Sequence, residues 1–102
     1  MISRLWHGWT TRENADAYER LLRAEILPGI HRVHGFKEAE LLRRDVEQEV
    51  EFVTITRFDS VEALKEFAGE DYEVAVVPPV ARKLLSRFDA RSAHYETMFR
   101  LE

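Results

Sequence analysis

Large apolar residues occur at both even and odd positions of residues 2–10, a stretch that contains both tryptophans of the chain. This pattern is interpreted as a first β-strand with apolar side chains on both faces. Leu5 and Trp9 fall on one face of this strand, whereas Ile2 and Trp6 fall on the other. A strand that is apolar on both faces must be covered on both. We therefore expect helices on one side of it and a second layer on the other.

A helical period of apolar residues begins after residue 10. Thr10 and Glu13 fit a capping box, which marks a helix start, and apolar residues then recur at three- and four-residue intervals as far as Ile26. The Pro28-Gly29 pair is expected to disturb or end this helix, because the residue before a proline is biased away from helical geometry. An irregular exit over residues 30–34 follows.

The next two segments predict a pair of strands, 36–45 and 49–58, joined by a turn at 46–48. The second is rich in β-branched residues, which favour strands. Asp59 and Glu62 resemble another capping box, and they predict a helix that stops at Gly69.

The last third of the sequence predicts a loop over residues 70–77, then a short helix and a final strand. Pro78-Pro79 suits the first turn of a helix over residues 80–88. Alternation over residues 92–101 predicts the strand that closes the chain.

The order of these elements predicts an α+β, ferredoxin-like βαββαβ fold with a four-stranded antiparallel sheet. In such a fold the helices cover only one sheet face. The other face would then leave a large apolar patch in water, which monomers rarely tolerate. We therefore expect a homodimer formed through that sheet face.

Size and composition limit the function classes. The 102 residues are a single-domain length, 1–102, and they include no cysteine, which excludes disulfides and thiolate chemistry. A net charge of −4 does not indicate the basic surface that nucleic-acid binding requires. No apolar run approaches the ~20 residues of a membrane span, and no secretory leader is evident. We expect a cytoplasmic protein without nucleic-acid or membrane partners.

The first and last strands of this fold are expected to be neighbours, which brings their polar residues together. His7 could then meet His94 or Glu96, and a histidine oriented by a carboxylate is a candidate general base. Trp6 and Trp9 would help to line a dry pocket beside it. The alternative is that these histidines make only packing or interface contacts.

Two further features are weaker candidates. Phe67 and Tyr72, on and after the second predicted helix, are candidate substrate-binding residues, although both residue types also serve packing. His31 and His34 have a spacing that metal ligands use, but they lie in a predicted loop without an accompanying carboxylate motif. We expect no metal and no other cofactor.

The chain resembles the antibiotic-biosynthesis-monooxygenase-type family of dimeric α/β-barrel proteins along nearly its whole length. The segments that carry this resemblance are residues 2–10, 14–18, 27–30, 35–36, 52–60 and 94–96. The resemblance implies a homodimer with a pocket between sheet and helices in each subunit. Some members oxidise aromatic polyketides or quinols with dioxygen and no metal or flavin, whereas others degrade haem.

The family's site residues are not reproduced here. Haem-degrading members carry an asparagine on the first strand, whereas the only asparagine here, Asn14, lies in the first predicted helix. Phe67 stands where those members have tryptophan, and Val77 and Pro78 stand where they have a histidine ligand. Haem degradation is therefore disfavoured. Quinol-oxidising members often have histidines where this chain has Phe67 and Tyr72.

Three hypotheses follow from these residues. The first is a cofactor-independent oxygenase for a small aromatic molecule, with His7 or His94 as base and Glu96 orienting it. The second is a dimeric binding or stress-related module that holds a small apolar ligand without chemistry. The third is a purely structural dimer.

Overall fold

The structure, a computed structural model, describes all of residues 1–102. Its elements are β1 (Ile2–Thr11), α1 (Arg12–Leu21), the π-helical segment η1 (Leu22–Ile26), α2 (Leu27–Ile30), β2 (Phe36–Val46), β3 (Glu49–Phe58), α3 (Val61–Ala68), α4 (Pro79–Arg82), β4 (Leu85–Phe88) and β5 (Ala93–Glu96). No helix among them is long and apolar enough to span a membrane.

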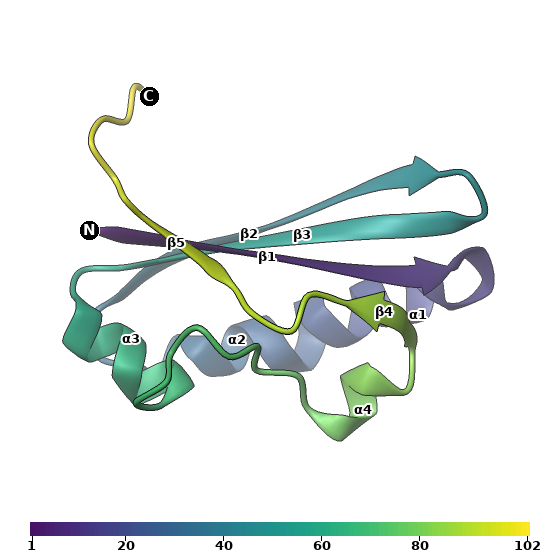
Figure 1. The fold of residues 1–102 in the computed structure, drawn as a ribbon, viewed down its shortest axis with the longest axis horizontal. Coiled ribbons are helices and arrows are strands. Elements are labelled where there is room, and N and C mark those ends of the chain that lie inside the picture. Colours follow the sequence, from purple (N-terminus) through teal and green to yellow (C-terminus); the bar gives the residue numbers. More distant parts are fainter.

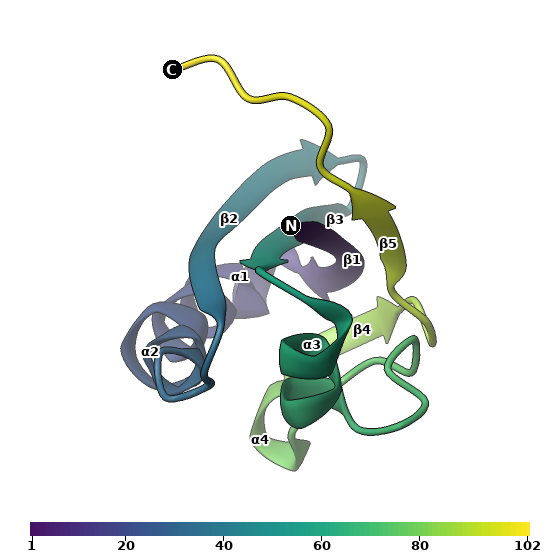
Figure 2. The ribbon, with the colours of Figure 1, turned by 90° about the vertical axis from the view of Figure 1, so that its left-hand side faces the viewer.

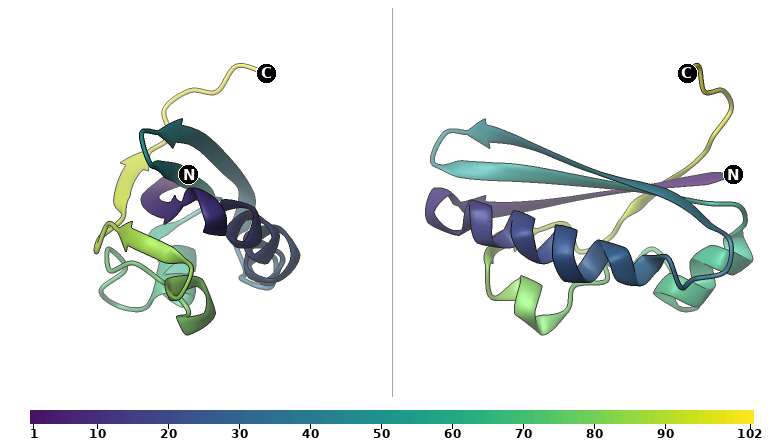
Figure 3. Two further views of the ribbon diagram at one scale, coloured as in Figure 1. Left: turned by 90° about the vertical axis from the view of Figure 1, so that its right-hand side faces the viewer. Right: turned by 180° about the vertical axis from the view of Figure 1, so that it is seen from behind.

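One antiparallel sheet organises these elements in the order β2-β3-β1-β4, and β5 also pairs with β1. The helices lie together on one face of the sheet and leave the other face bare (Figures 1 and 2). The view from behind shows the long helical run α1-η1-α2 beneath the β2-β3 hairpin (Figure 3). The predicted α+β, ferredoxin-like fold is confirmed.

β1 is central because both of its edges are paired. Its whole length pairs with β3, in a register that places Leu5 opposite Ile55 and Trp6 opposite Thr54. Its other edge is shared, since β5 pairs with the first half of β1 and β4 pairs with Gly8–Thr10. Side chains alternate between the two faces of a strand. Even-numbered residues of β1 therefore face the helices, and odd-numbered residues face away.

The core lies between the sheet and the helices. Tyr18 of α1 packs edge-on against Phe52 of β3 with ring centroids 4.8 Å apart, and both side chains are fully buried. A second cluster joins Phe58 of β3 to Leu64 of α3 and Ile30 of α2. All five belong to the apolar stripes of their elements, which is why these faces pack together.

Both predicted helix caps are wrong by one residue. Thr11 caps α1 by accepting a hydrogen bond from the Asn14 N–H, and Ser60 caps α3 by accepting one from the Ala63 N–H. Thr10 instead remains in the strand with its side chain fully buried. A cap needs an exposed, extended residue immediately before the first helical turn. Pairing with β3 extends β1 by one residue and moves that position to Thr11.

Pro28-Gly29 disturbs the helix without ending it, which is the first of the two predicted outcomes. Leu27 is helical, with φ −63° and ψ −42°, and its N–H donates to the Leu22 carbonyl. This five-residue spacing makes η1 a π-helical turn. Because Pro28 has no N–H to donate, the wider turn placed just before it lets the helix run on to Ile30.

Two predictions in the last third are corrected. The helix predicted over residues 80–88 is only Pro79–Arg82, and Leu85–Phe88 forms β4. The unpaired edge of β1 explains this difference, since its N–H and C=O groups need partners that a helix could not supply. The final strand is Ala93–Glu96 rather than residues 92–101, because Glu96 already lies opposite Ile2, the residue at which β1 begins.

Candidate functional site

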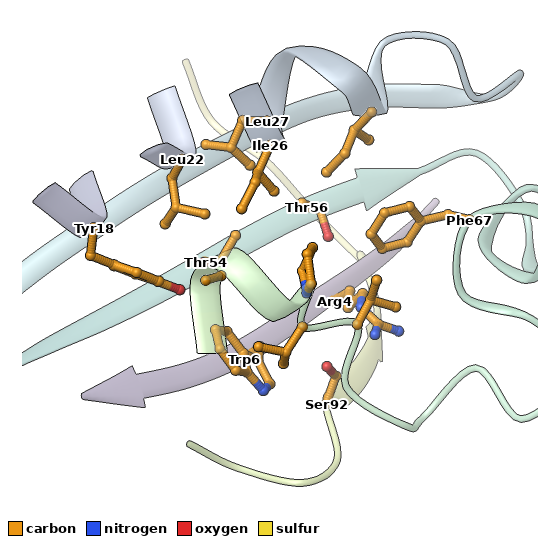
Figure 4. A pocket seen from close by; sticks show the side chains of 15 residues that line it. Arg4, Trp6, Tyr18, Leu22, Ile26, Leu27, Thr54, Thr56, Phe67 and Ser92 are labelled. Carbon is orange, nitrogen blue, oxygen red and sulfur yellow. The ribbon is translucent and has the colours of Figure 1, made fainter. Parts of the chain in front are cut away.

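A pocket opens between the helix face of the sheet and the helices (Figure 4). It encloses about 550 Å³ of space not filled by atoms, part of which is open to solvent. Fifteen residues line it, and ten of them are hydrophobic. They come from β1 and β3, from the helices α1, η1, α2, α3 and α4, from the segment that leads into α4, and from Ser92 just before β5. A largely apolar pocket with a few polar groups is the usual form of a small-molecule site.

Trp6 forms part of the wall, and its position depends on Gly8. A methyl group built on Gly8 would lie 3.0 Å from the indole of Trp6 and 3.1 Å from Leu85. The indole N–H donates to the Asp89 carbonyl at 2.7 Å, and the indole also contacts Phe88 with ring centroids 5.9 Å apart. The missing side chain at Gly8 therefore lets Trp6 lie across the strand at the pocket.

Arg4 is the one charged residue that lines the pocket, and only 4% of it is exposed. Its guanidinium donates to the carbonyls of Tyr72 and Val74, and its Nη1 lies 2.9 Å from His94 Nε2. It also lies over the ring of Phe67, 5.6 Å from the centroid. No carboxylate lies within ion-pair distance of it. Arg4 is thus a buried cation without an anionic partner.

Burial lowers the pKa values of both Arg4 and His94. It lowers the pKa of Arg4 to about 10, so the guanidinium still carries its charge at neutral pH. Burial, with a further contribution from the Arg4 charge, lowers the pKa of His94 from its usual 6.5. Each effect disfavours the charged form. His94 is therefore neutral near pH 7, and its Nε2 can accept the hydrogen bond from Arg4.

The hydroxyl groups of Thr54, Thr56, Ser92 and Tyr18 complete the polar lining. Ser92 is 6% exposed, and its Oγ has no hydrogen-bond partner in the chain. Figure 4 shows this hydroxyl at the Arg4 end of the pocket, with the phenol of Tyr18 pointing in from the opposite end. Burial raises the pKa of Tyr18, so it remains a neutral phenol.

The other face of the sheet carries a different cluster. His7 Nδ1 lies 2.8 Å from Glu51 Oε2, and Arg44 donates to the other oxygen of the same carboxylate at 2.6 Å. His7 also stacks on Trp9. These two hydrogen bonds, first that from His7, lower the pKa of Glu51. The cluster borders a shallow hollow on the bare sheet face and is separate from the apolar pocket.

The predicted pairing of His7 with His94 or Glu96 is therefore wrong. β5 pairs only with the first half of β1, where His94 lies opposite Arg4 and Glu96 opposite Ile2. His7 instead faces away from the helices and lies opposite Val53 of β3. The histidines were expected to meet because the register and the length of β5 could not be read from alternation alone.

Only some of the remaining candidate site residues lie at the pocket. Trp6 and Phe67 line the pocket, and Tyr72 packs edge-on against His94 beside it, with centroids 5.1 Å apart. Trp9 lies on the opposite face under the guanidinium of Arg87. His31 lies edge-on against Phe36 outside the pocket.

Arg4 and Ser92 were missed by the sequence-based prediction. One signal for Arg4 was available in the sequence, because it is the only charged residue among the even-numbered positions of β1. Nothing in the sequence singled out Ser92, since its burial depends on the loop packed over it.

The comparisons with known proteins agree with this architecture. The family model described as "Antibiotic biosynthesis monooxygenase" matches residues 1–77. The chain belongs to the antibiotic biosynthesis monooxygenase family. The matched region includes β1, β2, β3 and the helices that build most of the pocket. No curated protein matches the sequence significantly.

Solved structures show that members of this fold are similar to the chain over its whole length. A Bacillus cereus protein described as an antibiotic biosynthesis monooxygenase is 16% identical with a TM-score of 0.69, covering 99% of this chain and 96% of its own. A Deinococcus radiodurans protein of the same description is 14% identical with a TM-score of 0.68, covering 100% and 97%. A MhuD mutant with two manganese protoporphyrin IX molecules bound per active site is 15% identical with a TM-score of 0.65, covering 100% and 99%. At these identities the likeness concerns the fold.

Proposed function

We propose that this member of the family is a cofactor-independent oxygenase for a small, flat aromatic molecule bound in the pocket between sheet and helices. The observation that carries the proposal is the pocket itself. Its lining is mainly apolar, with Trp6 and Phe67 offering aromatic surfaces for a planar ring. A ring of this kind buried away from water is protected from side reactions of its oxidised intermediates.

The chemistry needs no metal if the substrate itself supplies the electrons. In an anthrone, for example, a ring CH₂ becomes a carbonyl: one atom of dioxygen enters the carbonyl, and the other leaves as water with the two hydrogens. Loss of a proton makes the ring electron-rich enough to react with dioxygen. We assign proton uptake to Nε2 of His94, which adjoins the pocket through Arg4 and is free to take the proton once its hydrogen bond with Arg4 is released.

Oxygen consumption with a panel of anthrones and quinols tests this assignment. We expect turnover by the wild-type protein and a loss of roughly 10²-fold or more in His94→Gln, the usual contribution of a general base. His34→Gln is the matched control, because His34 is exposed and lies outside the pocket. Absence of turnover by the wild type with every substrate would contradict the oxygenase proposal.

A second function is favoured by one observation: no histidine or carboxylate is among the pocket-lining residues. A pocket without a base of its own is suited to holding an apolar ligand without chemistry. Native mass spectrometry distinguishes the two functions. A small molecule retained through purification, in a protein that consumes no oxygen with any substrate, would favour the binding module.

The same lining argues against haem. The manganese porphyrin bound by MhuD raises the question of a similar ligand here, but the lining includes no histidine, cysteine or methionine to bind the metal. Tyr18 also lines the pocket, but burial raises its pKa and disfavours the phenolate that would bind a metal. The residues present do not fit a metalloporphyrin. We propose no step through haem.

We also propose that the bare sheet face pairs with that of a second copy. This face presents Leu5, Val53 and Ile55 in a row across β1 and β3, and Leu42 beside them is 47% exposed. In Figure 1 the C-terminal tail also extends on the side away from the helices. Within this tail Met98, an exposed apolar residue, is 82% accessible. Contiguous apolar surface of this kind is typical of an interface.

Sedimentation velocity tests the dimer. We expect a wild-type dimer and a monomer for Ile55→Asp, because a buried, unpaired carboxylate would face the partner. Glu62→Lys is the control, since Glu62 is exposed on α3 on the opposite side of the sheet. A monomeric wild type at micromolar concentration would refute the proposal.

A further inference from the structure

The charge of Arg4 is incompletely balanced within the chain. An arginine side chain has five N–H donors. Three hydrogen bonds are made here, to the carbonyls of Tyr72 and Val74 and to His94 Nε2. Two donors therefore have no partner, although 96% of the residue is buried. A buried cation surrounded only by neutral acceptors is unfavourable unless an anion reaches it.

A comparison within the chain shows that this is unusual here. Arg43, on the same face of the sheet, makes ion pairs of 3.1 Å with Asp16 and 2.9 Å with Glu19. Arg57, on the bare face, is paired with Glu38 and with a second carboxylate. Both of these cations have carboxylate partners, although both are more exposed than Arg4. The missing anion at Arg4 is therefore a local feature of the pocket.

Ser92 provides an independent observation at the same place. Its Oγ is buried without a partner, which costs free energy unless something fills the position. Its N–H donates to the Glu73 carbonyl at 2.6 Å, whereas Arg4 binds the carbonyls on either side, those of Tyr72 and Val74. The same three-residue segment thus positions both groups, and both line the pocket (Figure 4).

We propose that the pocket binds its aromatic ligand as an oxyanion, with the charged oxygen held by the free N–H groups of Arg4 and the hydroxyl of Ser92. The inference rests on the proposed aromatic-binding function and specifies its ligand class. One cation in an apolar lining selects a singly charged molecule, either an ionised phenol or enol or a carboxylate. Arg4 is then the specificity-determining residue. It also favours the ionised, electron-rich form of a phenolic substrate.

Four probes with the same ring test this proposal. They are 4-nitrophenol and its neutral methyl ether 4-nitroanisole, and 4-nitrobenzoate and its neutral amide. Binding is measured through quenching of Trp6 fluorescence in a Trp9→Phe background, since Trp9 lies on the other face. We expect each anion to bind roughly tenfold to hundredfold more tightly than its neutral counterpart, as charge-assisted hydrogen bonds imply. The tighter anion identifies phenolate or carboxylate as the preferred group.

The absorbance of bound 4-nitrophenol gives a second readout that a purely structural role of Arg4 would not affect. We expect the pKa of the bound phenol to fall below that of the free phenol, because Arg4 stabilises the phenolate. Arg4→Met should abolish both this fall and the preference for anions, and Arg4→Lys should restore part of each. Ser92→Ala should weaken anion binding several-fold. Arg43→Met is the matched control and should change neither readout.

The outcomes separate this inference from the function on which it rests. Equal binding of the anionic and neutral probes, or a bound phenol whose pKa is unchanged or raised, would overturn the oxyanion site while leaving an aromatic pocket. Absence of binding by all four probes would overturn both. If Arg4→Met does not fold, Ser92→Ala and the wild-type titration still decide the question.

Discussion

The two faces of β1 balance charge in opposite ways. On the face turned away from the helices, the buried carboxylate of Glu51 binds both His7 and Arg44, which are more exposed, so the buried charge there is paired. On the helix face, Arg4 is buried and has only neutral partners, in the wall of an apolar pocket. Folding alone selects for paired charges. The helix face, where the charge of Arg4 is unpaired, is also the face that has room for a ligand. The unpaired charge therefore points to function.

The largest expected effect tests which face holds the core. Phe52 and Val53 are neighbours on β3 but point to opposite faces, and only Phe52 is fully buried. Phe52→Ala should lower the free energy of unfolding by about 3–5 kcal/mol. Val53→Ala should cost about 1 kcal/mol. Urea denaturation measures both. Equal losses would contradict a core confined to the helix face.

A change at Gly8 tests the shape of the pocket wall. Gly8→Val should destabilise the fold by about 1–3 kcal/mol, because the new side chain would overlap Trp6 and Leu85. It should also weaken binding of aromatic probes by displacing the indole. Gly29→Ala is the control, since no atom lies within 4 Å of a methyl group at Gly29. An unchanged thermal midpoint and probe affinity in Gly8→Val would show that Trp6 does not depend on Gly8.

A smaller effect concerns the paired charges of the bare face. Hydrogen bonds from His7 and Arg44 lower the pKa of Glu51 below its usual 4.5. A carboxylate whose pKa is depressed on folding stabilises the protein above the unfolded pKa, and this contribution is lost as the pH falls through the folded pKa.

Glu51→Gln should therefore cost about 1 kcal/mol at neutral pH, because both partners are partly exposed. The cost should begin to decrease near pH 4.5, the usual pKa of the group, and should disappear below the lower pKa of the folded protein. Denaturation curves at several pH values measure this difference, with Glu62→Gln as the control. A pH-independent cost would show that the ion pairs are not its source.

Much of the fold could be predicted from the sequence, because the large apolar residues of 2–10 and the β-branched residues of 49–58 identify the two central strands directly. The site was harder to predict. The parity of β1 correctly separated Trp6 from Trp9, but the partner of His7 depends on strand order and register. β4 was predicted as helix because Leu84, Leu85 and Phe88 have helical spacing. The free edge of β1, a tertiary feature, determines their conformation instead.

The smallest expected effect on stability concerns His94, which lies beside Arg4. Burial first, and then the charge of Arg4, lowers its pKa below 6.5. In the unfolded chain His94 takes up a proton near pH 6.5, before the folded protein does, so stability should decrease as the pH falls below that value. An NMR titration of the histidine signals should place the His94 midpoint below 6.5 and raise it in Arg4→Met, because the repelling charge is gone. A wild-type midpoint at or above 6.5 would mean that Arg4 and His94 are not buried together, and the asymmetry between the two faces of β1 would be lost.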